Sequence, residues 1–402
     1  MAPLKEIRIV DITRAMAGPY CTMMLGDFGA DVIKIERPGT GDESRGWGPP
    51  FVGEPYSIYP GQSAYYLSAN RNKRSLTVNL KDPAGQEIVR KLAGISDVLI
   101  ENYRTGVLDK LGLGFEELQK DNPALIYCSI SGYGRTGPDR EKPGYDAIIQ
   151  AEGGMMSITG PSEGPPSRVG VPIIDITSGM FAASAILAAL LERESTGLGQ
   201  HLDVSLLDTQ TALLANVASN YLLSGDPPQR QGNAHPNIAP YEPFQARDKG
   251  FVLGAANQGQ WMKLCQLIDR MDLAEDPRYH DNQARVKHRE ELNQVLDEIF
   301  GTRDAEDWLA LLEEAGLPCG PINTVPEVFQ HPQVLARDMV QEVDLPAVGR
   351  ISLTGFPYKL SRTPVELRLA PPALGEHNRE ILVDLLGYSE EEVEDFQVKG
   401  VI

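Results

Sequence analysis

Asp175 lies where the extended apolar run GVPIID meets a long apolar segment that continues to about Arg193. An aspartate at such a junction often caps a helix, because its carboxylate accepts hydrogen bonds from the free backbone amides of the first turn. The same position suits acyl transfer, since free amides and the positive helix end favour an ionised carboxylate and can stabilise a neighbouring oxyanion. An ionised carboxylate can attack an acyl group and form a covalent intermediate. The local pattern is consistent with both the cap and the nucleophile.

Basic side chains gather near the ends of expected strands in the first half of the chain. Arg37 closes the segment KIERPG, and Arg104 and Lys110 follow the apolar segment VLIEN. Ligands of open α/β sheets bind beyond the carboxyl ends of the strands, so Arg37 and the stretch Asn102–Arg104 can converge. A further group, NRNKR at 70–74, lies on the chain entering its strand. Several fixed cations suit a ligand with a diphosphate and another phosphate, and a solvated charged loop is the alternative.

Two short motifs match known fingerprints without the context that these require. The glycines of SGYGRTG (131–137) fit the dinucleotide pattern, but Pro138 and Pro143 prevent a helix from starting where a pyrophosphate needs one. GPSEG (160–164) fits the nucleophile elbow of hydrolases, but the surrounding prolines predict a surface loop. We therefore expect neither a nicotinamide cofactor nor a serine nucleophile.

The histidines and cysteines predict no metal site. The six histidines lack ligand spacing, and the four cysteines, at positions 21, 128, 265 and 319, include no C-x-x-C pair. We expect buried, reduced thiols instead.

The composition is that of a globular protein large enough for two domains. The chain has 402 residues, of which 42% are hydrophobic and 23% charged. Its formal charge of −19 disfavours nucleic acid as the main partner, although a local basic pocket for a small anion is compatible with it. We see no apolar run approaching the roughly 20 residues of a membrane helix and no signal-peptide pattern. We therefore expect a cytoplasmic protein without a membrane partner.

Strand and helix patterns alternate through the first half of the chain, which favours an α/β fold with a parallel, doubly wound sheet. The expected strands include residues 7–13, 31–36, 75–80, 98–102, 125–131 and 199–206, and the expected helices include about 19–28, one starting at Pro83, and about 179–193. The amino-acid composition changes after Ser224, where a segment rich in Pro, Gly and Asn begins. We expect a first domain over 1–224, a smaller α+β domain over 225–330, and a C-terminal segment over 331–402.

Taken together, these stretches resemble the class III CoA-transferases, the family of formyl-CoA transferase and carnitine CoA-transferase. The matching motifs run in order almost end to end and include RAMAGPYCTMMLGDFGADVIKIERPGTGDESRGW, NKRSLTVNL, VLIENYRTGVLDKLGLG, GYDAIIQAEGGMMSITG, GVPIIDITSG, GNAHPNIAPYEPF and GLPCGPIN. The resemblance implies a large Rossmann-like domain built from both chain ends, with a small domain from the middle. It also implies that two ring-like chains interlock into a homodimer.

The resemblance assigns Asp175 as the nucleophile and coenzyme A, carried as acyl-CoA, as a substrate rather than a permanently bound cofactor. The stretches that would hold coenzyme A contain Met16, Ala17, Arg37, Asn72, Lys73, Asn102, Tyr103, Arg104, Lys110, Tyr145 and Asp146. Asp175 would attack the donor thioester to form an aspartyl–acyl anhydride, and the CoA thiolate would convert this to an aspartyl-CoA thioester. The acceptor carboxylate would then take the acyl position.

Two alternatives within this resemblance differ in their chemistry. In the α-methylacyl-CoA racemases a histidine occupies the place of Tyr145 and a glutamate that of Asn257; a tyrosine titrates too high for a base near neutrality and an amide cannot serve at all. A non-catalytic acyl-CoA binder is the other alternative, and the retained Asp175 argues against it.

The segment QGNAHPNIAPYEPF (231–244) replaces the glycine-rich loop of formyl-CoA transferase and resembles the succinate–hydroxymethylglutarate (glutarate) CoA-transferases. We therefore expect a dicarboxylate acceptor rather than oxalate. Burying the second carboxylate unpaired would be costly, so it needs a positive or amide-rich partner, for which Asn233, His235 and Asn257 are the candidates.

Overall fold

The computed structural model describes residues 2–53, 62–346 and 348–402. The chain forms two compact units, the first made of residues 1–154, 169–213 and 332–402, and the second of residues 155–168 and 214–331. The C-terminal segment thus belongs to the first unit. The loop 155–168 and residues 214–224, which we had expected in the first domain, belong to the second.

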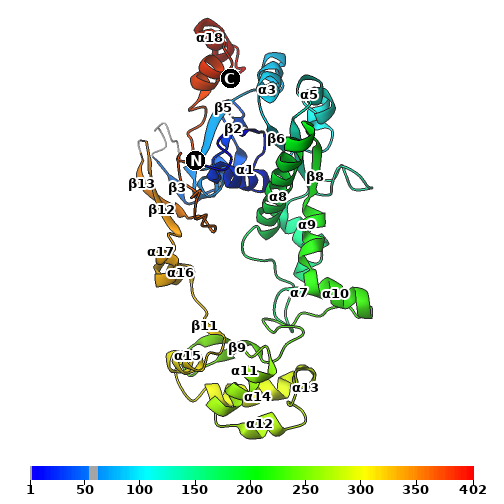
Figure 1. Cartoon of the computed structure of the whole chain (residues 1–402), viewed down its shortest axis with the longest axis vertical. Coiled ribbons are helices and arrows are strands. Elements are labelled where there is room, and N and C mark those ends of the chain that lie inside the picture. The colour runs from blue at the N-terminus through cyan, green and yellow to red at the C-terminus, as the bar shows by residue number, and fades with distance from the viewer. Residues whose placement is uncertain (1, 54–61, 347) are drawn as a thin grey trace. The chain divides into compact units, whose positions relative to one another are not determined.

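A six-stranded parallel sheet forms the centre of the first unit, in the order β5-β2-β1-β6-β7-β8 (Figure 1). The strands are β1 (Arg8–Asp11), β2 (Asp31–Glu36), β5 (Lys73–Thr77), β6 (Val98–Glu101), β7 (Ile126–Ser131) and β8 (His201–Ser205). Numbered within this sheet the order is 3-2-1-4-5-6, that of doubly wound dinucleotide-binding folds, with the direction of winding reversing between β1 and β6. The expected α/β class with a large parallel sheet is confirmed.

Helices cover both faces of this sheet. One face is apolar, whereas the other also carries the buried charged side chains of Asp11, Lys34 and Lys73. On one side lie α1 (Ala17–Asp27) and α8 (Ile173–Thr196), and on the other α3 (Pro83–Gly94), α5 (Phe115–Asp121) and the π-helix η2 (Glu380–Leu385) (Figure 1). The C-terminal segment joins this core: Ile381 and Leu382 are fully buried in it, and the amide of Asn79 donates to the carbonyl of Val401. Burial of these side chains accounts for its place in the first unit.

Helix α8 packs closely on α1 through small residues. A Cβ added to Gly179 would lie 2.5 Å from the carbonyl oxygen of Ala17, and Ala182 and Ala183 are buried beside it. The start of α8 is therefore held against the start of α1, where the loop after β1 ends.

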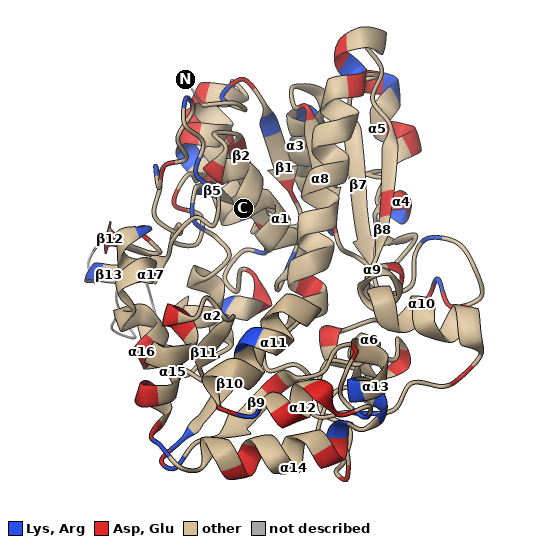
Figure 2. Ribbon diagram, turned by 60° about the horizontal axis from the view of Figure 1, so that its bottom comes forward, with Lys and Arg blue, Asp and Glu red and all other residues tan. Residues whose placement is uncertain are grey.

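By length and composition α8 could also cross a membrane, which we had not expected. It has 24 residues, with a mean hydropathy of 1.8 in its most apolar window, 44% of which is buried in the protein. Packing on α1, β7 and β8 accounts for the buried part. Figure 2 shows the helix as largely free of charge, and Met180, Phe181, Leu187 and Leu191 are exposed on it. One apolar face of α8 is thus uncovered in the single chain.

The second unit contains a three-stranded antiparallel sheet, in the order β11-β10-β9, packed by helices. Its core includes Phe251, Trp261, Phe300 and Trp308. The elements are α7 (Met155–Ile158), α10 (Ala215–Ser224), β9 (Tyr241–Gln245), β10 (Gly250–Gly254), α11 (Gln258–Leu267), α12 (Met271–Glu275), α13 (Asn282–Lys287), α14 (Arg289–Phe300), α15 (Ala305–Glu314), β11 (Cys319–Pro321) and α16 (Val325–Gln330).

Shorter elements complete the first unit. They are η1 (Glu43–Gly46), β3 (Phe51–Val52), β4 (Gln62–Ser63), α2 (Ala64–Leu67), α4 (Val107–Lys110), α6 (Asp146–Glu152), α9 (Leu206–Leu213), α17 (Pro332–Ala336), β12 (Val340–Leu345), β13 (Gly349–Thr354) and α18 (Glu390–Val398). After β7 the next helix is α6, so no helix begins at the glycine-rich loop 131–137, as predicted.

Candidate functional site

Two adjoining cavities lie in the first unit, beyond the carboxyl ends of its central strands. The larger, the Arg37 cavity, has a volume of about 660 Å³, and the smaller, the Asp175 cavity, about 140 Å³. Both are lined by Arg14, Glu43 and Tyr103. Their position at the reversal between β1 and β6 is where doubly wound sheets bind ligands.

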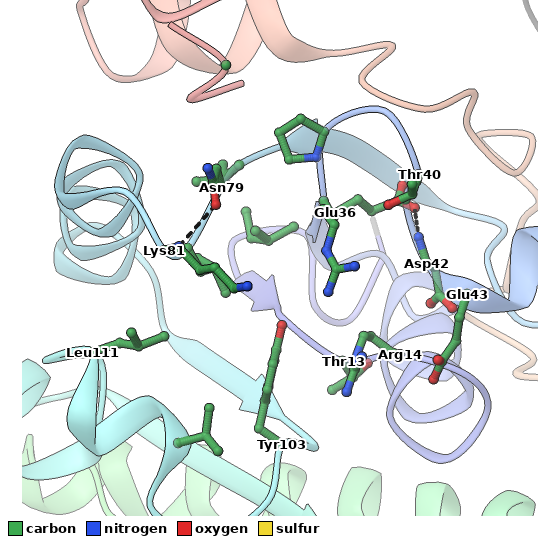
Figure 3. A pocket seen from close by; sticks show the side chains of 18 residues that line it. Thr13, Arg14, Glu36, Thr40, Asp42, Glu43, Asn79, Lys81, Tyr103 and Leu111 are labelled. Carbon is green, nitrogen blue, oxygen red and sulfur yellow. Dashed lines mark hydrogen bonds between the residues drawn. The ribbon is translucent and has the colours of Figure 1, made fainter.

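The Arg37 cavity collects cations from separate loops. Arg14 follows β1, Arg37 follows β2 and Lys81 follows β5. Figure 3 shows Arg14, Lys81 and Tyr103 directed into the same space, and the Arg14 guanidinium lies 4.9 Å from the centre of the Tyr103 ring. Fixed cations around a cavity of this size suit a ligand with several phosphates.

The Asp175 cavity is lined by residues that we had predicted from the sequence and by others that we had missed, among them two cations. Met16, Ala17, Asn102, Tyr103, Arg104, Tyr145 and Asp175 are the predicted ones. Arg140 and Lys142 also line it. Both belong to the run DREK (139–142) between Pro138 and Pro143, and its two cations were the available signal.

Asp175 is the third residue of α8 and does not cap it. The N-cap position is Pro172, and the capping acceptor comes from another segment. Asp146 Oδ1 accepts from the backbone N–H of Ile174 at 2.8 Å and from that of Asp175 at 3.3 Å. The interpretation of Asp175 as a helix cap is therefore wrong, and Asp146 leaves the Asp175 side chain free for other contacts.

The electrostatic setting of Asp175 also differs from our expectation. Burial, and after it the negative charge of Asp146, raise the pKa of Asp175 to about 7. The first-turn amides serve Asp146, so they do not favour an ionised Asp175 as we had proposed. Burial together with Asp175 and Asp146 raises the pKa of Tyr65, on α2, to about 12. Asp175 is thus a partly buried carboxylate beside a like charge.

The loop that precedes α1 is held in a strained shape by buried side chains. The side chain of Asn102 accepts from the N–H of Arg14 at 2.9 Å and donates to its carbonyl at 2.8 Å. Asp42 accepts from the N–H of Ala15, whose φ of 67° is unfavourable for a residue with a Cβ. Lys34 donates to the carbonyl of Thr13 at 2.9 Å. Asn102 therefore acts on the loop, and its amide group is engaged there.

Asn72 and Lys73 do not line either of the two cavities, and a direct contact of either with coenzyme A stays a prediction. Lys73 is fully buried, and its ammonium group donates to Asp11, to the carbonyl of Pro19 and to Asn70. The side-chain oxygen of Asn72 accepts from the backbone N–H groups of residues 368 and 369. Through these bonds the two side chains hold α1 and the C-terminal segment against β5.

The remaining predicted residues are placed as follows. Lys110, the last residue of α4, is exposed and does not line either of the two cavities. Asn233, His235 and Asn257 belong to the second unit. Asn257 caps α11 by accepting from the N–H of Gln260 at 3.0 Å. A role for these three in binding an acceptor acid stays a prediction.

Comparison with known proteins identifies the family. A model described as CoA-transferase family III matches residues 4–378. The chain belongs to this family. It is 46% identical over its full length to the succinyl-CoA:glutarate CoA-transferase of Mus musculus, covering 91% of that protein. It is 45% identical to the succinate–glutarate CoA-transferase of Agrobacterium fabrum, with 95% of this chain and 96% of that protein aligned.

A solved structure shares the fold of this family III CoA-transferase. It is the CAIB/BAIF family protein from Brucella suis, with a TM-score of 0.83 and 43% identity, covering 95% of this chain and 99% of that one. CoA-transferases use CoA thioesters as substrates. The resemblance stated from the sequence is confirmed at the level of the family and of enzyme activity.

Proposed function

We propose that this family III enzyme transfers CoA from succinyl-CoA, or a related acyl-CoA, to a free dicarboxylic acid through covalent intermediates on Asp175. The observation that carries this proposal is the position of Asp175. Its carboxylate lies in a small cavity that shares Arg14, Glu43 and Tyr103 with the larger, cation-lined Arg37 cavity. A nucleophile at the inner end of a phosphate-binding groove fits a long thioester substrate with its phosphates at the other end.

Coenzyme A has a phosphate-rich end and a thiol end, and we match the first to the Arg37 cavity and the second to the Asp175 cavity. Its adenosine phosphates would lie among Arg14, Arg37 and Lys81, and its thioester would reach Asp175 past Tyr103. Arginine is well suited to phosphate because its guanidinium donates two parallel hydrogen bonds. Met16 and Ala17, both buried at the start of α1, would form an apolar wall for the thiol end.

The reaction balances as a series of acyl transfers. A carboxylate oxygen of Asp175 attacks the donor carbonyl, the C–S bond breaks, and CoA leaves as a thiolate from an aspartyl–acyl anhydride. The thiolate attacks the aspartyl carbonyl and releases the donor acid, which leaves an aspartyl-CoA thioester. The acceptor carboxylate displaces CoA from this thioester, and the thiolate then attacks the acceptor acyl group. The product acyl-CoA forms, and the carboxylate of Asp175 is regenerated.

The surroundings of Asp175 favour the covalent states. Acylation replaces a negative carboxylate by a neutral anhydride or thioester. Burial and the charge of Asp146 disfavour the charged form, as the raised pKa of Asp175 shows. The same effect makes the ionised carboxylate more basic, and therefore more nucleophilic.

The dicarboxylate preference rests on similarity to the named relatives and on the cations near Asp175. Arg104, Arg140 and Lys142 line the Asp175 cavity, and any of them can pair with the second carboxylate of a dicarboxylate. Asn233, His235 and Asn257 remain proposed contributors from the second unit.

We also propose a homodimer, interlocked as the family resemblance implies, and a cytoplasmic location. The exposed apolar side chains of α8 support association, because large uncovered apolar surfaces usually mark interfaces. Tyr221, Leu222 and Leu223 add exposed apolar surface on α10.

The test is to incubate the protein with succinyl-CoA and a panel of mono- and dicarboxylic acids, and to identify new CoA thioesters by mass spectrometry. We expect glutarate-like dicarboxylates to react faster than monocarboxylates of equal length; equal rates would contradict the preference. Hydroxylamine added during turnover should modify Asp175, as shown by peptide mass spectrometry. An unmodified Asp175 peptide beside a labelled residue elsewhere, or turnover by folded Asp175→Asn, would contradict the proposed nucleophile.

A further inference from the structure

Glu101 is a buried acidic residue at the carboxyl end of β6, outside the residues that line the two cavities. It is 2% exposed, and burial raises the pKa of its carboxyl to about 7. The chain then continues through Asn102, Tyr103 and Arg104, which line the Asp175 cavity. Its position therefore allows it to shape the wall of the site without touching a ligand.

The carboxylate of Glu101 holds the turn that places Tyr103. Its Oε2 accepts from the backbone N–H of Tyr103 at 2.7 Å, and Oε1 lies 3.5 Å from Nη1 of Arg135. Tyr103 lines both cavities, so a shift in this turn would alter the passage between them.

Arg135 connects this turn to α4, to β8 and to the loop 131–137. Its Nη2 lies 3.0 Å from Oδ2 of Asp109 on α4, the helix whose Val107 lines the Arg37 cavity. Its backbone N–H donates to Asp203 on β8 at 2.9 Å. It stands in the loop 131–137, whose first two residues line the Asp175 cavity. One guanidinium thus joins the loops after β6 and β7 to α4.

We propose that the Glu101–Arg135 pair is a positioning pair that sets the affinity of the enzyme for acyl-CoA by holding the loops of both cavities together. This inference rests on the proposed function, because it requires that the cavities bind acyl-CoA. Neither residue lines either of these two cavities, so each acts on them through the loops and not through contact with the substrate.

The pair should also make acyl-CoA binding depend on pH near neutrality. The charged and titratable groups around Glu101 are Tyr103 in its own turn, Asp109 on α4, Tyr127 and Cys128 on β7, Arg135, and His201 and Asp203 on β8. Burial raises the pKa values of Tyr127 and Cys128, so both stay neutral. Burial and Arg135 lower the pKa of His201, so it is uncharged near neutrality. Glu101 is therefore the group that changes charge, and protonation removes the charge that attracts Arg135.

The experiment compares Glu101→Gln with Asp97→Asn as a matched control. Asp97 directly precedes the other end of β6, where it pairs with Arg193 at 2.8 Å, far along the strand from the cavities. Both changes neutralise one carboxylate of one ion pair. Calorimetric titration with CoA would be carried out at about pH 6, 7 and 8, in the Asp175→Asn background so that Asp175 does not titrate.

We expect Glu101→Gln to weaken CoA binding at pH 8 by on the order of tenfold, the usual effect of losing a charge-assisted hydrogen bond. In the Asp97→Asn protein, ionisation of Glu101 should strengthen CoA binding between pH 6 and pH 8. In the Glu101→Gln protein this contribution to CoA binding should be absent. Arg135→Lys, which keeps the charge, should lose less affinity than Arg135→Met.

Equal CoA affinity and equal pH dependence in the Glu101→Gln and Asp97→Asn proteins would overturn the inference. A comparable loss in both would overturn it as well, because the effect would then come from general destabilisation of β6. Failure of CoA to bind even the protein with an unaltered pair would instead overturn the proposed function, and this inference with it.

Discussion

At the scale of single residues, the chemistry of Asp175 depends on a second carboxylate that the sequence places far away. Asp146 lies 28 positions before Ile174, whose N–H it accepts, and it also accepts from Gln150 at 2.6 Å. Asp146 thus stabilises the helix that carries Asp175 while its charge raises the pKa of Asp175. The same side chain therefore acts on the stability of the helix and on the proposed nucleophile.

Asp175→Asn should make the protein more stable above pH 7. The pKa of Asp175 is raised to about 7 in the folded protein, so the unfolded chain, whose aspartate ionises at a lower pH, is favoured as the pH rises. The cost is absent below about pH 4, grows between about pH 4 and pH 7, and amounts to roughly 1 to 4 kcal/mol above that range. Asparagine does not titrate, so it avoids this cost. Urea unfolding of both proteins at about pH 4 and pH 8 measures the difference; equal free energies of unfolding at pH 8 would contradict the prediction.

Asp146→Asn should shift the pH dependence of transfer to lower pH. The asparagine oxygen can still accept from the N–H of Ile174, but the negative charge beside Asp175 is lost. The pKa of Asp175 should fall, so the rate should reach its plateau at a lower pH than in the unsubstituted enzyme, and the plateau itself should be lower because the carboxylate is less basic.

A rate profile between about pH 5 and pH 9 tests this prediction. Asp146→Ala is the comparison, because it also removes the capping acceptor, which should cost about 1 kcal/mol of stability. An unchanged midpoint in Asp146→Asn would mean that Asp146 does not act on the charge of Asp175.

At the scale of elements, the contact between α1 and α8 brings Met16, Ala17 and Asp175 into one cavity. Both helices begin at this cavity, and they pack so closely that a Cβ added to Gly179 would lie only 2.5 Å from the carbonyl oxygen of Ala17. The loop before α1 is fixed by Asn102 and Asp42, at the cost of the unfavourable φ of Ala15. The cavity is therefore formed by the N-terminal ends of α1 and α8 and by the loop before α1, which Asn102 and Asp42 hold in place.

Gly179→Ala should destabilise the protein and reduce activity, although alanine favours helices over glycine. The added methyl group would collide with the carbonyl of Ala17, and such overpacking typically costs about 1 to 3 kcal/mol. Gly94→Ala in α3 is the matched control, since no atom lies within 4 Å of the added Cβ, and it should leave stability unchanged or raise it by up to about 1 kcal/mol. Thermal unfolding of both variants separates packing from helix propensity; a Gly179→Ala protein as stable as the control would contradict close packing.

At the scale of the whole molecule, the single chain leaves apolar surface uncovered on α8 and α10. Phe181 is 47% exposed and Leu191 71% exposed, and in the second unit Leu222 and Leu223 are 79% and 89% exposed. Exposed apolar side chains that gather on one helix favour association of two chains in water.

Phe181→Glu combined with Leu191→Glu should therefore weaken the proposed dimer. A charge placed in an apolar interface must be desolvated on association, which costs several kcal/mol when it has no partner. Analytical ultracentrifugation should show the unsubstituted protein as a dimer and the variant as a monomer or an aggregate. Interlocking is tested separately by mixing tagged and untagged folded protein; exchange of subunits under native conditions would contradict it.

The sequence alone was sufficient for the features that arise from neighbouring residues. Apolar runs and glycine and proline positions predicted the alternating strands and helices, because such patterns act over a few residues. The ordered motifs also identified the family. The sequence also placed several candidate residues near strand or helix ends, namely Arg37, Tyr103, Arg104 and Asp175. The parallel topology brings such ends to one edge of the sheet.

Only the tertiary structure decided which polar groups serve the site and which serve the fold. Lys73 and Asn72 carry groups suited to phosphate, yet both side chains are buried and bonded within the protein. Lys73 donates to Asp11, and Asn72 accepts from the backbone of the C-terminal segment. The capping of α8 by Asp146 and the pairing of Glu101 with Arg135 join segments distant in the chain. Desolvation and hydrogen-bond partners depend on which segments meet, so no local pattern contains them. For this reason the sequence was enough to propose Asp175 as the nucleophile, whereas the structure was needed to explain the raised pKa of Asp175 and the positions of the loops around it.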